Sequence, residues 1–514
     1  MAVSHQWFIQ WSTPSLLFAD INREYNNINP NWNYKQNYRS PYERPSTPVN
    51  EDYYYDDKPN YGNSNNKNND YESKRSEISD RTRAAGVTLW LAMLGLSHSQ
   101  SVPTDTETLP FSTLYKWKHV DFEFPSERHR LYAIAKGDFI PANVLPLGLE
   151  VWGSRVFVTL PSWRRGVPAT LATVSRTGGV TSPRLKPYPD WSYHRAFSKS
   201  SNCSGLTSVF RMSVDPCGRL WVLDSGQIDS QDDPKQICPP SIIVFDLQTD
   251  LTVARYIIPK EYVKEDSLYS NIIVDSRTDD CSDLYVYITD TWRFGLLVFR
   301  ESDESFWRFS HHFFYPDPLA SNYTLHGLNF QWSDGIFGLA LSPIDEHNER
   351  ILFFHSMSSY REFFVKTSIL RDASRVNNSV TEFKLLGESR GLFGQSSASA
   401  IDSRGVMFYG LVTRDSIGCW DMRKPYLKRN TGVVAMNTET LIFPNDIKVD
   451  QEVRQSVWVI SNRLPMFQAG PLSPNDYNYR IMYADTSEAV RGTVCDPNVS
   501  LVHFQTINTR NWMK

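Results

Sequence analysis

The sequence predicts an all-β fold, a six-bladed β-propeller preceded by a disordered N-terminal extension. The first observation behind this prediction is a strand-like motif that recurs along the chain, a run of β-branched or aromatic residues closed by Asp, Ser, Asn or Gly. The clearest copy is Arg219–Gly226, and others begin at Arg155, Asp283, Gly335, Gly405 and Val457. Their spacing of roughly 50 to 70 residues is close to the period at which four-stranded sheets repeat in a propeller.

The second observation is the turn chemistry between these runs. Asp215-Pro-Cys-Gly218 and Asp402-Ser-Arg-Gly405 each precede a strand-like run, and Gly supplies the positive φ that such turns need. The runs Ile242–Asp246, Gly295–Phe299 and Arg350–Phe354 look like second or third strands of a meander. From about residue 114 to 500 we count six such units, and long helical periodicity is absent. A β-sandwich is the competing fold, but it does not predict a repeat at this period.

The N-terminal part of the chain has a different composition. Residues 1–83 are predicted to be a disordered extension, because most of this stretch is rich in Asn and Tyr and almost lacks Leu, Val and Ile. Residues 84–101 come directly after a basic flank. They consist of about 13 apolar residues followed by a short stretch of small polar residues, which is the pattern of a secretory signal. Residues 102–514 are assigned to the propeller.

The position of the apolar segment leaves three interpretations open. It lies some 80 residues into the chain, too far for an ordinary signal peptide, and it is short for a membrane span. It can be a signal used from a later start, an uncleaved anchor at residues 84–96 that makes a type II membrane protein, or a soluble helix. We favour the signal and therefore secretion to the extracellular space, with membrane association only if the anchor remains.

Cysteines and glycosylation sequons point to the same compartment. None of the six cysteines forms a CxxC pair, which favours structural disulfides in an oxidising compartment over zinc or redox motifs. Spacing alone leaves fifteen pairings open. Candidate glycosylation sites are Asn202, Asn322, Asn377 and Asn498. The alternative is a cytosolic protein with reduced, buried cysteines.

Several long motifs resemble the insect yellow and major royal jelly proteins. These motifs are Trp117–Asp121, Cys203–Gly205, Arg219–Gly226, Cys238–Asp246, Gly335–Pro343, Gly418–Trp420 and Tyr479–Met482. The resemblance covers about residues 111 to 500. It implies a six-bladed propeller, secretion, and roles in cuticle pigmentation, melanin chemistry or aromatic-amine binding. The Asn- and Tyr-rich extension departs from the short family leader and is similar to the yellow-h branch.

The same resemblance implies which cysteines form disulfide bonds with each other. Cys203, Cys238, Cys419 and Cys495 lie in motifs that royal jelly relatives share, which implies the pairs Cys203–Cys238 and Cys419–Cys495. Cys217 and Cys281 are additional, and they are expected to form a third bridge.

Candidate ligand-contacting residues come from the expected channel mouth. No nucleophile, nucleotide or metal motif is present, so we predict no metal and no cofactor. Phe443–Asp446 is expected to precede a strand, Gln331–Gly335 to enter an inner strand, and Gly394–Ala398 to allow close backbone approach. A carboxylate with an aromatic wall suits an aromatic amine.

We therefore assign Asp446 and Asp334 as candidate catalytic carboxylates, and Phe443, Asn445 and Trp332 as candidate ligand-binding residues. All five can equally be turn or packing residues.

Three functions follow from the family resemblance. The first is dopachrome conversion, a tautomerisation that needs a base and an acid but no redox cofactor. The second is a non-catalytic carrier of catecholamines or other aromatic amines, and the third is a structural or nutritional secreted protein. The expected partner is a small aromatic amine or aminochrome. A net charge of −4 gives no electrostatic case for nucleic acid.

Overall fold

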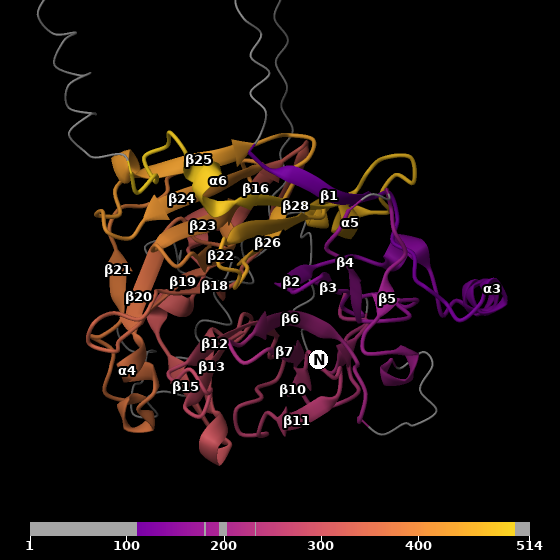
Figure 1. The fold of residues 1–514 in the computed structure, drawn as a ribbon, viewed down its shortest axis with the longest axis horizontal. Coiled ribbons are helices and arrows are strands. Elements are labelled where there is room, and N and C mark those ends of the chain that lie inside the picture. The colour runs from indigo at the N-terminus through magenta and orange to yellow at the C-terminus, as the bar shows by residue number, and fades with distance from the viewer. Residues whose placement is uncertain (1–109, 179–180, 195–202, 232, 499–514) are drawn as a thin grey trace, which may run out of the picture. The chain divides into compact units, whose positions relative to one another are not determined.

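Six antiparallel four-stranded sheets, the blades, follow one another around a ring (Figure 1). The computed structural model describes residues 110–178, 181–194, 203–231 and 233–498, and every structural statement below concerns these residues. The predicted extension (1–83), the apolar segment (84–101) and the sequon at Asn202 lie outside them. Within the described part, no helix is both long and apolar enough to cross a membrane.

The first three blades are built in chain order. Blade 1 contains β2 (Gly148–Trp152), β3 (Arg155–Thr159), β4 (Leu171–Ser175) and β5 (Lys186–Pro187). Blade 2 contains β6 (Val209–Val214), β7 (Arg219–Asp224), β10 (Ser241–Asp246) and β11 (Thr252–Ile257). Blade 3 contains β12 (Tyr269–Ser276), β13 (Leu284–Asp290), β14 (Gly295–Arg300) and β15 (Ser305–Ser310). Each is a meander whose first strand is innermost, since β6 contacts both β2 and β12 around the axis.

Blades 4 to 6 continue the ring. Blade 4 contains β18 (Ile336–Leu341), β19 (Ile351–Ser356), β20 (Glu362–Lys366) and β21 (Lys384–Leu386). Blade 5 contains β22 (Ser396–Ile401), β23 (Val406–Leu411), β24 (Ser416–Asp421) and β25 (Thr431–Met436). Blade 6 contains β26 (Pro444–Val449), β27 (Ser456–Ser461), β28 (Tyr479–Asp485) and β1 (Ser112–Trp117). The innermost strand β26 contacts β2, so the ring closes and the predicted six-bladed propeller is confirmed.

The recurring motif marks second strands in five blades. The copies beginning at Arg155, Arg219, Gly405 and Val457 fall on β3, β7, β23 and β27, and the copy at Asp283 on β13. The copy at Gly335 is instead the innermost strand of blade 4, so the repeat read from the sequence mixes two strand positions. Both strand types are buried on both faces in a propeller, which gives them the same apolar pattern.

The predicted turns hold the first strand of a blade to the second. In the turn after β6, Gly218 has φ +77° and the Asp215 carboxylate accepts the backbone N–H groups of Cys217 and Arg219. The turn after β22 repeats this arrangement: Gly405 has φ +84°. Both turns therefore need glycine at the last position, as predicted.

Strand β1 closes blade 6 by pairing with β28, from the opposite end of the propeller sequence (Figure 1). Trp117 is buried, and its indole N–H donates to the carbonyl of Pro183 at 2.8 Å. The side-chain amide of Asn478 donates to the carbonyl of Lys118 across 360 residues of chain. The two ends of the propeller thus share one sheet.

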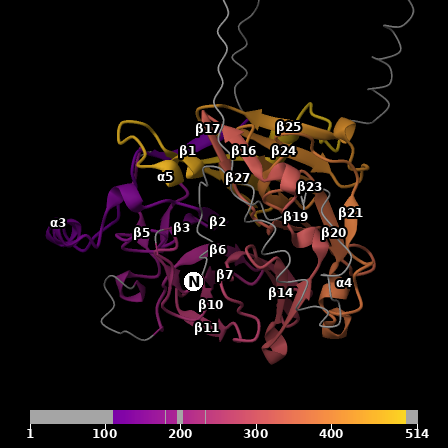
Figure 2. The same cartoon turned by 180° about the vertical axis from the view of Figure 1, so that it is seen from behind.

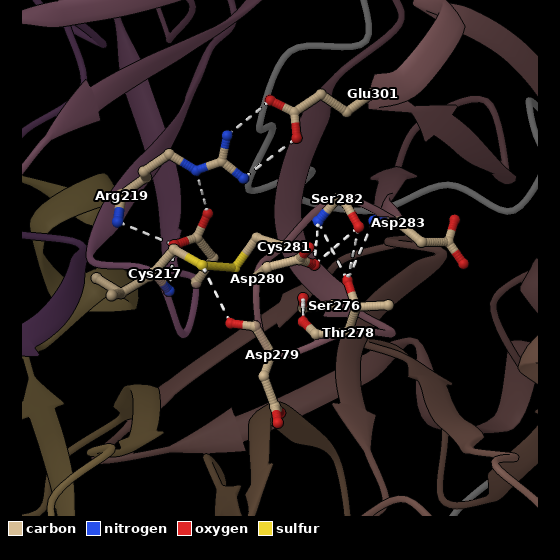
Figure 3. The surroundings of a disulfide bond; sticks show 12 residues. Cys217, Arg219, Ser276, Thr278, Asp279, Asp280, Cys281, Ser282, Asp283 and Glu301 are labelled. Atoms are coloured by element: carbon tan, nitrogen blue, oxygen red, sulfur yellow. Dashed lines mark hydrogen bonds and ion pairs between the residues drawn. A yellow bond between two sulfur atoms is a disulfide. The ribbon is translucent and has the colours of Figure 1, made fainter.

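Three disulfides are present, and they join the pairs expected from the sequence: Cys203–Cys238, Cys217–Cys281 and Cys419–Cys495. Figure 3 shows that Cys217–Cys281 connects the turn of blade 2 to the turn of blade 3. Next to it, Arg219 forms an ion pair with Asp215 and a two-bond ion pair with Glu301 of blade 3, at 2.8 and 3.1 Å. A covalent and an ionic link therefore join these two blades.

Two additions to the ring were not predicted. Helix α3 (Glu127–Lys136) projects from the side of the ring (Figure 1), capped by Ser126 and ended by Gly137 at φ +74°. A hairpin of β16 (Asn322–Leu325) and β17 (Leu328–Gln331) precedes blade 4 (Figure 2). It is tied to blade 5 by His326, whose ring lies 2.7 Å from the carboxylate of Asp415.

The remaining strands and α-helices are short. They are β8 (Gln227–Ile228) with β9 (Lys235–Gln236), α4 (Thr367–Leu370), α5 (Leu464–Ala469) and α6 (Thr486–Val490).

Candidate functional site

A cavity of about 550 Å³ lies in the central channel and is lined by all six innermost strands. It opens where these strands end, among the turns that follow β6, β18, β22 and β26. Its volume is in the range of small-molecule sites. Polar and aliphatic side chains contribute about equally to the wall, and the polar ones include Glu150, Ser213, Asn271, Ser399, Asp446 and Lys448.

Glu150 is a carboxylate of this cavity whose pKa differs from its ordinary value. It lies on β2, and its side chain is 8% exposed. The ammonium of Lys448, on β26, is 3.7 Å from one Glu150 oxygen and donates to the carbonyl of Met212 at 2.8 Å. Burial raises the pKa of Glu150 to about 7, against the opposing attraction of Lys448. A carboxyl group with this pKa can accept and return a proton near neutral pH.

Asp446 also lines the cavity, but its oxygens are already engaged. One oxygen accepts the backbone N–H of Ile447, and the other accepts that of Leu149 at 3.0 Å. The latter oxygen also lies 3.5 Å from Nε of Arg211, a guanidinium that is completely buried. Asp446 is therefore held in place between blades 6, 1 and 2 by contacts to both of its oxygens.

Asn445 holds the guanidinium of Arg211. Its backbone carbonyl and its side-chain oxygen both accept from Nη2 of Arg211, at 3.1 and 2.5 Å. Asn445 is absent from the cavity wall, so it supports Arg211 from behind. The sequence predicted that Phe443–Asp446 precedes a strand, whereas β26 begins at Pro444. Asn445 and Asp446 consequently lie on the innermost strand itself.

Asp334, Trp332 and Phe443 lie away from this cavity, at the other ends of the innermost strands. As predicted, Gln331–Gly335 leads directly into an innermost strand, β18. Trp332 packs edge-on against Phe443 with ring centroids 5.8 Å apart, and both rings are buried in an aromatic cluster with Tyr323. Because none of these residues lines the cavity, ligand binding by Trp332 and Phe443 stays a prediction.

The Asp334 carboxylate is buried in the same aromatic cluster. It accepts from the indole N–H of Trp292 at 3.2 Å, and its second oxygen has no hydrogen-bond partner within the described chain. Burial raises the pKa of Asp334 to about 7. The propeller thus holds two buried carboxyl groups of similar pKa, and Glu150, unlike Asp334, lines the channel cavity.

Glu150, Lys448 and Arg211 were missed in the sequence. The available signal was one charged residue inside an otherwise apolar strand, as in Gly148-Leu-Glu-Val-Trp152. A charge buried on an innermost strand needs a partner in the channel, so it identifies a candidate site.

Three predicted glycosylation sites fall within the described residues. Asn322, Asn377 and Asn498 are all exposed, so the side chains are accessible for modification.

The comparisons with known proteins agree with the motifs. The family model described as major royal jelly protein matches residues 207–495. The chain belongs to the major royal jelly protein family. Within this family it is 41% identical over 413 residues to dopaminechrome tautomerase of Drosophila melanogaster, covering 79% of this chain and 88% of that protein. It is 39% identical over 385 residues to Protein yellow of Drosophila erecta, covering 74% of this chain and 70% of that protein. The predicted membership is therefore confirmed.

Proposed function

We propose that this protein is a secreted tautomerase that converts a catecholamine-derived aminochrome into a dihydroxyindole, a step of pigment formation, in the channel cavity. The observation that carries the proposal is Glu150, a carboxyl group with a pKa of about 7 on the wall of a ligand-sized cavity. The 41% identity to a dopaminechrome tautomerase supports the choice of substrate class. The three disulfides support secretion.

The reaction is an isomerisation in which the two saturated ring carbons each lose a proton and the two quinone oxygens each gain one. In the proposed first transfer, the Glu150 carboxylate takes a proton from one saturated carbon, the electrons of that C–H bond move into the conjugated ring, and one quinone oxygen takes up a proton to become a hydroxyl. In the second transfer the other saturated carbon loses a proton and the second quinone oxygen becomes a hydroxyl, which completes the aromatic indole ring. The Lys448 ammonium, beside Glu150, stabilises the negative charge that develops on the first of these oxygens.

Asp446 has a different role in this proposal. Since its oxygens already accept hydrogen bonds and face Arg211, it supplies a fixed negative charge for the positively polarised nitrogen of the substrate. The aliphatic side chains of the wall, among them Ile272, Leu339 and Ile447, contact the flat ring of the aminochrome in this proposal.

The test follows the absorbance decay of dopaminechrome with the purified propeller and with heat-inactivated protein. E150Q keeps the size of the side chain but cannot accept a proton, so we expect a 10²- to 10⁴-fold loss of rate. D334N makes the matched change in the buried carboxylate of the aromatic cluster, and it should retain activity. If D334N lost activity and E150Q retained it, we would place the active site at the aromatic cluster instead.

If neither the wild-type protein nor the variants accelerated the decay of dopaminechrome, the proposed tautomerase activity would be refuted. Calorimetric binding of dopamine without turnover would then identify a carrier, and absence of both would leave a structural or nutritional protein. Secretion is tested separately by mass spectrometry of the mature N-terminus, expected near Val102; an intact Met1 would contradict cleavage.

A further inference from the structure

A second cavity, of about 450 Å³, lies on the side of the propeller between blades 4 and 5. It is formed by the segment 388–392, which leads from β21 to β22, and by strands β23 and β25. Its lining mixes three cationic side chains, two tyrosines and several aliphatic residues: Arg390, Arg414, Lys428, Tyr409, Tyr426, Leu392, Leu411, Leu427 and Val433. No residue of the channel cavity contributes to it.

The inner wall contains a buried hydroxyl group. Tyr426 is 3% exposed, and its hydroxyl interacts with Tyr409 and with the Arg390 guanidinium. Because a hydroxyl has one donor and two acceptor sites, a polar ligand atom in the cavity can form a further hydrogen bond with it.

The three cations differ in how far their charge is neutralised. Arg390 is paired with the buried Glu362 at 2.7 Å, and Glu362 also accepts from His355 at 2.9 Å. Arg414 and Lys428 form no ion pair within the described chain; Arg414 donates to the carbonyl of Leu392 at 2.6 Å. One carboxylate, Glu388, lies on the rim, where it accepts the backbone N–H of Lys428. The rim therefore carries an excess of positive charge.

The mouth is also unusually apolar for a surface. Leu392, Phe393 and Val433 are 71%, 52% and 44% exposed beside it. Deeper in, the Tyr409 ring lies across Gly418, where an added Cβ would come within 2.3 Å of the ring. An aromatic floor, an apolar mouth and unneutralised cations together fit a molecule that has both an apolar body and an anionic group.

We propose that this side cavity, here named the blade 4–5 pocket, binds an amphipathic organic acid. The carboxylate pairs with Arg414 and Lys428 at the rim, the body lies between Tyr409 and Leu411, and a polar atom reaches the Tyr426 hydroxyl. This ligand has the opposite charge to an amine and occupies a different place from the channel substrate. The proposal is independent of the proposed tautomerase.

The test titrates the full propeller with 3-(4-hydroxyphenyl)propionate by calorimetry. Its primary amide, which has the same shape without the charge, is the matched ligand, and inorganic phosphate is the second comparison. We expect saturable binding of the acid, at least tenfold weaker binding of the amide, and no binding of phosphate at the same concentration. R414Q should weaken the binding of the acid at least tenfold, because the charge-assisted hydrogen bond between the carboxylate and Arg414 is lost.

Two further variants make the outcome decisive. Y426F removes only the hydroxyl oxygen that the ligand is proposed to contact, so it should weaken binding of the acid several-fold, and it provides a second test if R414Q fails to fold. R423Q is the matched control, since Arg423 is an exposed arginine of blade 5 that pairs with Asp421 outside the pocket. Equal affinity for acid and amide, affinity unchanged in Y426F, or phosphate binding as tight as the acid would each overturn the proposal.

Discussion

Replacing Glu150 by Gln should make the protein less active and, at alkaline pH, more stable. In the folded protein the pKa of this carboxyl group is about 7, raised from 4.5 mainly by burial. The folded state therefore holds the proton up to about pH 7, whereas the unfolded chain releases it near pH 4.5. The stabilisation that protonation gives is complete below pH 4.5 and is lost as pH rises through 7.

The size of this effect follows from the two pKa values. At about 1.4 kcal/mol per tenfold change, a rise from 4.5 to about 7 corresponds to about 3 kcal/mol of unfolding free energy. Glutamine does not titrate, and Lys448 keeps its hydrogen bond to Met212 in the variant. The stability of E150Q relative to wild type should therefore be about 3 kcal/mol higher at pH 9 than at pH 4.

The assay combines urea unfolding of both proteins at pH 4 and pH 9 with aminochrome conversion. The rate of the wild-type protein should rise with pH through about 7, as the base loses its proton, and E150Q should lose this dependence. A relative stability that is the same at both pH values would refute the raised pKa. Activity unchanged in E150Q would refute the role as base, whatever its stability.

Three other expectations concern the scaffold and its processing. Removing the Cys217–Cys281 bridge in the double alanine variant should lower the unfolding free energy by about 2 to 4 kcal/mol, because it closes a long loop; unchanged urea midpoints would contradict this. Trp117→Ala should cost about 3 to 5 kcal/mol and expose the blade 6 seam to limited proteolysis, while wild-type resistance would show that β1 is dispensable. After expression through the secretory pathway, Asn322→Gln and Asn377→Gln should each remove one glycan mass, and an unchanged mass would show that the site is unused.

The sequence was a good guide to the scaffold because propeller strands have a local signature. Buried strands with an apolar run and an Asp-x-x-Gly turn are recognisable wherever they occur, as at Arg219–Asp224. The contribution of β1 to blade 6 was not foreseen, since pairing across most of the chain leaves no local pattern. Helix α3 was missed because few of its residues are buried, so it lacks an apolar stripe.

The candidate site was harder to predict than the fold. Asp446 was selected for its place beside an expected strand, and it does line the cavity, whereas Asp334 was selected on equal grounds and lies in an aromatic cluster. Which end of a strand faces the open mouth depends on how the loops pack, and that is a tertiary property. Glu150 was overlooked because a single glutamate has no spacing to recognise; its raised pKa arises mainly from burial, which outweighs the opposing attraction of Lys448.

Because blade 6 contains strands from both ends of the propeller sequence, it cannot be completed until β28 has been synthesised. Strand β1 is made early, yet its partner β28 is about 360 residues further along, judged by the Lys118–Asn478 contact. At a synthesis rate of about 5 to 20 residues per second, β1 remains without its partner for roughly 20 to 70 s. During that interval Tyr115 and Trp117, both buried in the finished ring, are available to chaperones or to wrong partners. Completion of the propeller is therefore limited by translation as well as by folding.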